Sequence, residues 1–262
     1  TGGEPFVRRD MMDFLRHIGQ IPGLRQINIT TNGTTTAPLV PELKAIGIKS
    51  VNLSMDTLDP DRFFEITRRN VFKEVMNTFH ALLEHGITTK INAVVMDGKN
   101  IDDLIPMAEL TKDHPVSVRF IEEMPLGVIT EHQRSQTHIS NDEIRQIITQ
   151  QYPLLAATDN TGGPARYYRM ADSQNRIGFI SPHSHNFCDT CNRVRVTVEG
   201  RLLLCLGNEH SADLKAPLRN FLHDDQPLID TLFNALPLKP ERHHFDLDDQ
   251  PQIVRFMNMT GG

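Results

Sequence analysis

Three adjoining segments decide the fold: S-V-N-L-S-M at residues 50–55, N-V-F-K-E-V-M-N-T-F-H-A-L-L-E-H at 70–85, and T-K-I-N-A-V-V at 89–95. The first alternates apolar and polar residues and the third is short and rich in β-branched residues, which predicts two strands. Apolar residues recur at helical spacing through the middle segment, and Gly86 directly after it suits the residue that follows a helix. The stretch therefore predicts strand, helix, strand.

Similar units precede and follow this stretch. We expect strands at 26–30 and 117–121 and a helix at 101–112. Ser140 and Glu143 have the spacing of a capping box, which opens a helix through residue 150. Repeated strand–helix units predict an α/β fold with parallel strands, as either a barrel or an open sheet.

The pattern changes after about residue 153. A Gly-Gly-Pro loop at 162–164 is followed by expected strands at 165–170 and 176–180, and then by the cysteine-containing segment. We therefore predict two regions, residues 1–152 and residues 153–262.

All three cysteines of the chain occur close together, as Cys188, Cys191 and Cys205. Two thiolates two residues apart can bind one metal from a single loop, and a third can reach it from a neighbouring strand. The spacing fits an iron–sulfur cluster with one open position. It also fits a Cys3His zinc site with His183 or His185 as the fourth ligand, and unligated buried thiols remain a third alternative.

The third cysteine belongs to an expected hairpin with strands at 194–198 and 201–206. In the simplest register, with a two-residue turn, Cys205 faces Val194, and Arg193 and Arg195 point to the opposite face. A shift by one residue reverses this, because side chains alternate along a strand. Either arginine is a suitable partner for thiolates and for anionic ligands.

The composition limits the class of protein. The chain has 262 residues, a formal net charge of −6 and an odd number of cysteines. This balance argues against a nucleic-acid-binding surface, and no apolar run is long enough to span a bilayer. Three clustered cysteines argue against a disulfide scaffold and favour a reducing cytoplasm.

Several polar or adaptable residues lie where strands end or loops begin in the expected fold. Charges inside apolar strands must face a polar site or an ion pair, since burying them unpaired is costly. For each residue a structural role is the alternative: an ordinary turn, a salt bridge, or gap filling by methionine. These candidates are Gly3, Glu4, Thr30, Ser54, Lys90, Arg119 and Met124.

The order of the motifs resembles the GTP 3′,8-cyclase family, radical S-adenosylmethionine enzymes of molybdenum cofactor biosynthesis. The resemblance covers essentially the whole chain. It rests on T-G-G-E-P (1–5), I-T-T-N-G (29–33), V-N-L-S-M-D (51–56), K-I-N-A-V (90–94), V-R-F-I-E-E-M (118–124), F-C-D-T-C-N-R-V-R-V (187–196) and the final G-G (261–262).

The resemblance implies a partial (β/α) barrel of the radical-SAM type and a C-terminal region that holds a second [4Fe–4S] cluster. It implies a lyase that converts GTP to 3′,8-cyclo-7,8-dihydro-GTP with S-adenosylmethionine. The implied partners are a flavodoxin- or ferredoxin-type electron donor and, downstream, a cyclic pyranopterin monophosphate synthase, with a homodimer left open.

The resemblance also implies site residues, position by position. Cys188, Cys191 and Cys205 would be the ligands of the second cluster. Contacts to GTP would come from Thr30, Lys90, Arg119, Arg193, Val194 and Arg195. Contacts to S-adenosylmethionine would come from Gly3, Glu4, Ser54 and Met124. The catalytic set would comprise Arg193, Arg195, Gly261 and Gly262.

Two features of the family are absent. Its first-cluster motif, C-x3-C-x2-C, lies upstream of the G-G-E-P loop, and an arginine precedes that loop; neither occurs in these 262 residues. With only three cysteines, we expect this polypeptide to hold at most the GTP-side cluster. By itself it should form no product, and a non-catalytic zinc- or nucleotide-binding module derived from this fold is the alternative function.

Overall fold

The computed structural model describes residues 3–127, 133–158, 163–243, 245, 256 and 259. The chain forms two compact units. We call Glu4–Glu123 with Gln136–Ser184 the sheet unit, and Thr1–Gly3, Met124–Ser135 and His185–Gly262 the cysteine unit. The expected boundary at residue 153 differs from this division, because residues 153–184 belong to the sheet unit.

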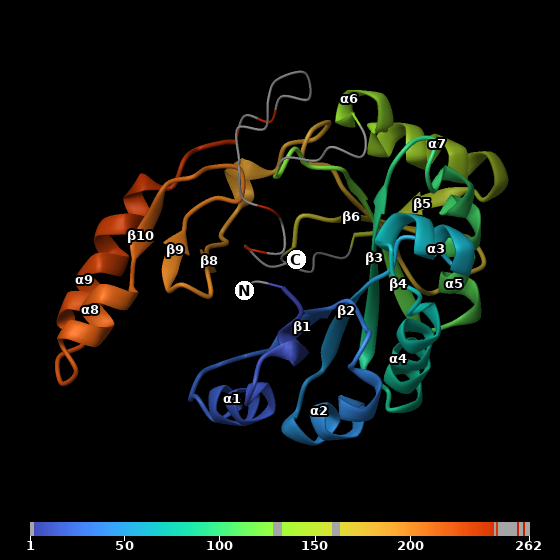
Figure 1. Ribbon diagram of the computed structural model, residues 1–262. Coiled ribbons are helices and arrows are strands. Elements are labelled where there is room, and N and C mark those ends of the chain that lie inside the picture. Colours follow the sequence, from blue (N-terminus) through green and yellow to red (C-terminus); the bar gives the residue numbers. More distant parts are fainter. Residues whose placement is uncertain are drawn as a thin grey trace. The chain divides into compact units, whose positions relative to one another are not determined.

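The sheet unit is built on a seven-stranded sheet with the order β1-β2-β3-β4-β7-β6-β5. Neighbouring strands from β1 to β4, and β4 with β7, are parallel, which confirms the predicted parallel arrangement (Figure 1). Strands β6 and β5 extend the sheet in antiparallel fashion. The strands are β1 (Asn28–Thr31), β2 (Ser50–Ser54), β3 (Thr88–Val95), β4 (Val116–Glu122), β5 (Leu154–Ala156), β6 (Arg166–Met170) and β7 (Ile177–Ile180).

Helices connect these strands. The predicted helix at 70–85 is α4 (Phe72–Glu84), and Gly86 follows it with a φ of 61°. The predicted capping box is present: the Ser140 hydroxyl accepts from the Glu143 N–H and the Glu143 carboxylate accepts from the Ser140 N–H, at the start of α7 (Asn141–Gln151). The other helices are η1 (Pro5–Val7), α1 (Met11–Gly19), η2 (Ala37–Leu39), α2 (Val40–Ile46), α3 (Pro60–Thr67), η3 (Ile101–Asp103), α5 (Leu104–Asp113) and α6 (Arg134–Thr137).

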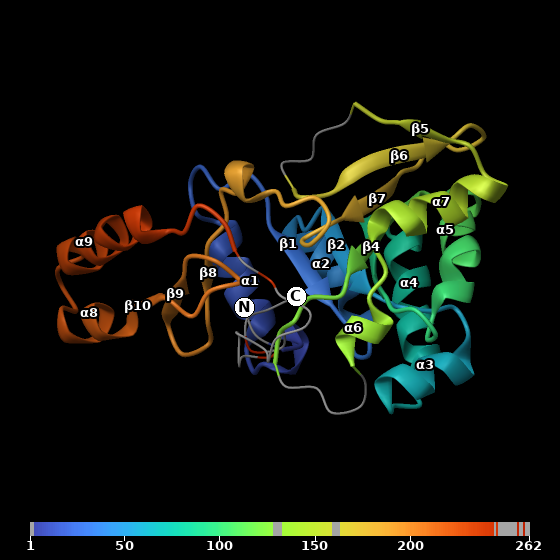
Figure 2. The same ribbon diagram turned by 90° about the horizontal axis from the view of Figure 1, so that it is seen from above.

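The core of the sheet unit lies between the sheet and its helices. Burial alternates along β3, so that one face of the strand is apolar and covered while the other is partly open. Helices α4 and α5 pack on β3 and β4 and lie side by side against the covered face (Figures 1 and 2). Leu53, Phe79, Ile91 and Phe120 are among the fully buried side chains here. Because the helices occupy one face, the polar side chains of the same strands point to the other face.

A buried carboxylate joins three parts of the sheet unit. Glu122, at the end of β4, is inaccessible to solvent. It accepts the N–H of Asn141 at 2.9 Å, the N–H groups of His183 and Ser184 at 2.9 and 3.1 Å, and the hydroxyl of Ser184. Such a charge is tolerated inside the protein because hydrogen-bond donors surround it.

The cysteine unit contains a small antiparallel sheet with the order β10-β9-β8. Its own core is small and centres on Leu202, Leu204 and Ala235. The elements are η4 (Cys188–Thr190), β8 (Arg195–Val196), β9 (Arg201–Leu203), β10 (Ser211–Asp213), α8 (Lys215–Asn220), α9 (Gln226–Ala235) and η5 (Leu236–Leu238). Within the described ranges, no helix has the length and apolar composition needed to cross a lipid bilayer.

The register of the hairpin differs from the simplest one. Arg195 pairs with Leu203, one residue away from the register in which Cys205 would face Val194. The cause is a three-residue turn: the N–H of Thr197 donates to the carbonyl of Arg201, and Gly200 has a φ of 80°. A side chain at Gly200 would also meet Cβ of Lys215 at 2.9 Å. The shifted register puts Arg195 on the same side of the hairpin as Leu203, and its continuation sets position 193 opposite Cys205.

Candidate functional site

The open face of the sheet carries two rows of polar residues in register. In parallel strands, partners in register share a face. The row nearer the start of the strands contains Thr30, Asn52, Lys90 and Ser117; the next contains Ser54, Asn92, Arg119 and Gly178. The structure thus brings four predicted site residues, Thr30, Ser54, Lys90 and Arg119, onto one face.

Asn52 connects the two rows. Its Nδ2 donates to Oγ1 of Thr30 at 3.0 Å, and its Oδ1 accepts from Nη2 of Arg119 at 2.6 Å. Sequence analysis did not single out Asn52. The available signal was its position two residues before Ser54 in the strand, which puts both side chains on the same face.

Lys90 and Arg119, the predicted cations on this face, lack carboxylate partners among the described residues. Burial lowers the pKa of Lys90, and the charges of Arg119 and Arg176 lower it further. Burial also lowers the pKa of Arg119, although Tyr167 opposes this. None of the ion pairs among the residues that the structure describes involves Lys90 or Arg119. The alternative that Lys90 and Arg119 form salt bridges is therefore not observed among the described residues.

Two buried polar atoms of the second row have no hydrogen-bond partner among the described residues: Nε of Arg119 and Oδ1 of Asn92. Unpaired buried groups are costly, so they indicate a place where a ligand supplies the partner. A face with excess positive charge, one free donor and one free acceptor fits a ligand that combines phosphate or carboxylate groups with N–H groups.

Gly178 of β7 provides room for the Arg119 side chain. A Cβ at this position would lie 2.9 Å from Cγ of Arg119 and 2.9 Å from Cε1 of Tyr167. The absence of a side chain on β7 therefore lets the guanidinium cross the sheet towards Asn52.

The residues expected to contact S-adenosylmethionine are divided between the units. The carboxylate of Glu4 accepts hydrogen bonds within the sheet unit, from the hydroxyl of Thr31 and from the N–H of Asn32, each at 2.7 Å. Ser54 is exposed at the end of β2. Gly3, with a φ of 59°, and the half-buried Met124 belong to the cysteine unit. The contacts of these residues with a cofactor stay predictions.

The three cysteines are reduced and half-buried in the cysteine unit. Hydrogen-bond donors reach each sulfur. Sγ of Cys188 accepts the N–H of His243 at 3.4 Å and lies 3.0 Å from its Nδ1. Sγ of Cys191 accepts Nζ of Lys239 at 3.8 Å, and Cys205 accepts the N–H of Gly207.

The thiol groups influence one another. Partial burial raises the pKa of Cys191, but the Arg193 N–H and the charges of Arg193 and Lys239 outweigh it, so the net pKa is lowered. Burial raises the pKa of Cys205; the Gly207 N–H opposes this, while the Cys188 and Cys191 thiolates add to it. The repulsion from Cys188 and Cys191 means that three negative sulfurs close together need a cation.

The predicted arginines adjoin these thiols. Burial and the neighbouring Arg193 lower the pKa of Arg195, and the thiolates of Cys191 and Cys205 counteract them. The guanidinium of Arg193 lies 5.3 Å from the ring centroid of Phe187, and Val194 between the two arginines is 42% exposed. Arg195 therefore lies within electrostatic reach of two of the three cysteines, as the shifted hairpin register requires.

No group of three or more His, Cys, Asp or Glu side chains in the described part of the chain is positioned to hold a metal ion. Convergence of the three sulfurs on one centre thus stays a prediction. The donor set nevertheless fits it chemically, since N–H groups and cations surround thiols that are thiolates when they bind iron or zinc.

Of the two histidines expected for a zinc site, His183 is engaged elsewhere, whereas His185 belongs to the cysteine unit. His183 belongs to the sheet unit, where its Nε2 lies 2.9 Å from the Glu123 carbonyl oxygen and its N–H donates to Glu122. The histidine beside Cys188 is instead His243, which sequence spacing did not indicate because it lies 55 residues away.

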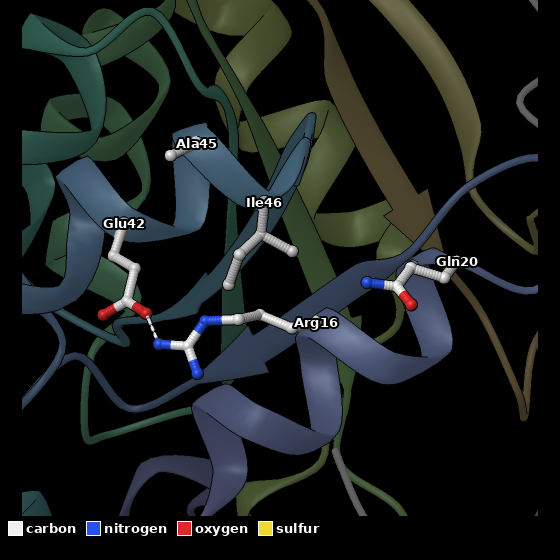
Figure 3. A pocket seen from close by; sticks show the side chains of 6 residues that line it. Arg16, Gln20, Glu42, Ala45 and Ile46 are labelled. Atoms are coloured by element: carbon white, nitrogen blue, oxygen red, sulfur yellow. Dashed lines mark hydrogen bonds and ion pairs between the residues drawn. The ribbon is translucent and has the colours of Figure 1, made fainter.

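A shallow pocket of about 350 Å³ lies on the sheet unit between α1 and α2. Arg16 extends across it to Glu42 and also pairs with Asp13, so its charge is neutralised within the protein (Figure 3). None of the predicted site residues lines it.

Comparison with known proteins assigns the family. Residues 1–111 match the Radical SAM superfamily, and residues 116–245 match the family described as Molybdenum Cofactor Synthesis C. The chain is 49% identical over its whole length to the GTP 3′,8-cyclase of Marinobacter nauticus, of which it covers 79%. The chain belongs to the GTP 3′,8-cyclase family. Within this family it is also 49% identical to the enzyme of Pseudomonas syringae pv. syringae and 47% identical to that of Pseudomonas entomophila, covering 80% and 79% of them.

A solved structure supports the fold of this GTP 3′,8-cyclase family member. Streptococcus suis SuiB bound to S-adenosylmethionine matches 98% of the chain and 64% of its own length, with a TM-score of 0.55 and 14% identity. The predicted radical-SAM type of α/β fold is confirmed. A [4Fe–4S] cluster and S-adenosylmethionine are the cofactors of this superfamily. Gly261 and Gly262 lie outside the described residues.

Proposed function

We propose that this chain is a lyase that converts GTP to 3′,8-cyclo-7,8-dihydro-GTP with S-adenosylmethionine, in the biosynthesis of the molybdenum cofactor. The observation that carries the proposal is Arg195: it lies opposite Leu203 and within electrostatic reach of Cys191 and Cys205. An arginine beside a thiolate site suits a substrate that combines a metal-binding base with a triphosphate. The names of the curated relatives supply the reaction.

In this proposal the sheet unit contributes Thr30, Lys90 and Arg119 to the binding of GTP. Lys90 and Arg119 lack carboxylate partners among the described residues, so an anionic ligand would relieve their mutual repulsion. Asn52 orients both Thr30 and Arg119. The cysteine unit contributes Arg193, Val194 and Arg195.

We assign Cys188, Cys191 and Cys205 as ligands of an iron–sulfur cluster that leaves one iron open to GTP. We assign the binding of S-adenosylmethionine to Gly3, Glu4, Ser54 and Met124. The Glu4 carboxylate already accepts hydrogen bonds from Thr31 and Asn32, so Glu4 would contact the cofactor through its backbone. The electron that cleaves S-adenosylmethionine would come from the first [4Fe–4S] cluster of the family, which is distinct from the cluster assigned to these three cysteines. Arg193, Arg195, Gly261 and Gly262 complete the proposed catalytic set.

The remaining partners follow from the reaction. A one-electron donor of the flavodoxin or ferredoxin type would supply electrons, and a cyclic pyranopterin monophosphate synthase would consume the product. A homodimer is a further proposal. Three free clustered cysteines suit the reducing cytoplasm.

The test is product formation. Protein that carries the first-cluster motif of the family in addition to these residues is reconstituted with iron and sulfide under anaerobic conditions. It is given GTP, S-adenosylmethionine and reductant, and the product is identified by mass spectrometry. Arg193→Ala should weaken GTP binding by about 2 kcal/mol, a few kcal/mol at most, because it removes a charge-assisted contact. An unchanged dissociation constant for GTP would contradict the role of Arg193. The expectation that these 262 residues alone form no product stays a prediction, and product from them would overturn it.

A zinc-binding module is the second candidate. It is favoured by one observation, the 3.0 Å separation between Nδ1 of His243 and Sγ of Cys188. Metal analysis of protein purified without oxygen distinguishes the two candidates. Iron with inorganic sulfide supports the cyclase, whereas stoichiometric zinc without sulfide supports the module.

A further inference from the structure

The side chain of Lys239 makes three contacts around the cysteine-containing loops. Its Nζ donates to the Leu204 carbonyl at 2.7 Å, to the Arg193 carbonyl at 2.8 Å and to Sγ of Cys191 at 3.8 Å. An ammonium group has three N–H donors. Each of them therefore has an acceptor within the cysteine unit.

The two carbonyl groups belong to the two separate segments that carry cysteines. Arg193 follows Cys191 by two residues, and Leu204 directly precedes Cys205. Beyond the last paired residues of the hairpin, Arg195 and Leu203, the described strand pairing ends. Lys239 thus links the two segments where strand pairing no longer holds them together.

The position of Lys239 is set by apolar packing and by proline. Leu204 and Ala235 share a buried cluster, which fixes α9 against the hairpin. The chain continues from α9 through η5, and Lys239 is the C-cap residue directly after η5, with φ −62° and ψ 122°. Pro240 follows, and a residue before proline is held in this extended conformation. The backbone therefore aims the lysine before its side chain forms any hydrogen bond.

We propose that Lys239 is a positioning residue of the thiolate site, whose ammonium group ties the Cys191 loop to the Cys205 strand and sets the spacing of their sulfurs. The identity of the metal centre rests on the proposed function, whereas the link that Lys239 forms between the two segments does not. Arginine is a poor substitute, because its planar fork cannot direct three donors from one nitrogen.

The inference also gives the charge of Lys239 a role. Thiolate ligands close together repel one another, and a fixed cation among them offsets that repulsion. Nζ of Lys239 lies 3.8 Å from Sγ of Cys191 and is held there by two carbonyl oxygens. Supporting contacts of this kind commonly affect metal affinity by about 10- to 100-fold.

The experiment measures the binding of Co²⁺ to metal-free chain through the thiolate-to-metal absorption band. Lys239→Met, which keeps the length of the side chain without its donors, should weaken Co²⁺ binding about tenfold. Lys239→Arg keeps the charge, so it should bind Co²⁺ more tightly than Lys239→Met but less tightly than the wild type. Its absorption band should differ in intensity from that of the wild type. Lys215→Met is the matched control, since Lys215 is exposed on α8 of the same unit, and it should bind Co²⁺ like the wild type.

The outcomes separate the two proposals. Wild-type affinity and an unaltered band in both Lys239 variants would overturn the inference, even if the protein makes product from GTP. Weaker binding in Lys239→Met with an unaffected Lys215→Met supports it, even if the protein makes no product. If Lys239→Met does not fold, Lys239→Arg decides: an unaltered affinity and band overturn the inference, and weaker binding supports it.

Discussion

The two units reach order by different means. The sheet unit buries a large apolar core beneath α4 and α5. The core cluster of the cysteine unit is small, and large apolar side chains in its helices and directly after them are exposed. These exposed residues include Leu218, Phe221, Leu222, Phe233 and Leu238. A small core supplies little stability, so bound metal and polar ties such as that of Lys239 must contribute more. The comparison suggests that ligand loss should affect the two units unequally.

The largest expected effect is the loss of the metal centre. Cys205→Ser should abolish metal binding at the three-cysteine site and remove hydrogen-exchange protection from β8 and β9, while β3 stays protected. Structural metal sites have apparent binding free energies on the order of 10 kcal/mol, more than any single core contact. Hydrogen exchange resolved by segment measures it, with metal-free wild type as the control. Equal losses of protection in β3 and β9 would contradict the comparison.

A matched pair of core substitutions comes next. Leu53 and Leu204 are 0% and 2% exposed, in the cores of the sheet unit and the cysteine unit respectively. Leu53→Ala should cost about 4 kcal/mol, and Leu204→Ala about 2 kcal/mol, because the smaller core collapses more easily around a cavity. Denaturant unfolding monitored by hydrogen exchange in each unit gives both values. A larger cost at Leu204 would show that the small core is the better packed.

The pH dependence of the sheet unit offers a smaller effect. Burial raises the pKa of Asp56 to about 6, with the Val94 N–H opposing the shift. The folded protein therefore binds this proton more tightly than the unfolded chain does. Its contribution to stability is full below pH 3.8 and is lost as pH rises to about 6. The loss is at most about 3 kcal/mol.

Asp56→Asn keeps an oxygen that can accept from Val94 but has no proton to lose. The variant should lack the fall in unfolding free energy between pH 4 and 6 (roughly the interval of the shift). Measurements on metal-free protein at several pH values suffice. The same pH profile for wild type and variant would rule out Asp56 as its source.

The smallest effect is expected on the open face of the sheet. Asn52→Leu removes the bridge between Thr30 and Arg119 at nearly constant volume and should cost about 1 kcal/mol of stability. GTP binding should weaken more than stability falls, because Arg119 loses its orientation. Calorimetric titration with GTP and thermal unfolding test this together. Asn175→Leu, which breaks side-chain hydrogen bonds elsewhere in the sheet unit, is the control for stability alone.

Sequence periodicity predicted the parts of the sheet unit that repeat. Helix α4 and the capping box of α7 follow local rules, and so do β2 and β3, whose side chains alternate. The position of β5 to β7 in the same sheet did not follow, because these strands join it through the parallel pairing of β7 with β4, in which Val118 and Ile177 are distant in sequence.

The candidate site was predictable to the extent that its residues have distinctive chemistry. Cysteines and charged residues inside strands are conspicuous, whereas Asn52, Lys239 and His243 are common residue types whose role comes from long-range neighbours. The hairpin register was wrong in its simplest form because a glycine at a positive φ adds one residue to the turn. A local pattern cannot distinguish these two turns.

The donors around Glu122 have a consequence for dividing this chain into fragments. A fragment that ended at residue 152 would keep the glutamate and its partner Asn141 but would lose the N–H groups of His183 and Ser184. Three of the four hydrogen-bond donors of the buried carboxylate, including the Ser184 hydroxyl, would then be missing, and water would have to replace them. Any shortened version of the sheet unit that is meant to stay folded therefore has to extend through residue 184.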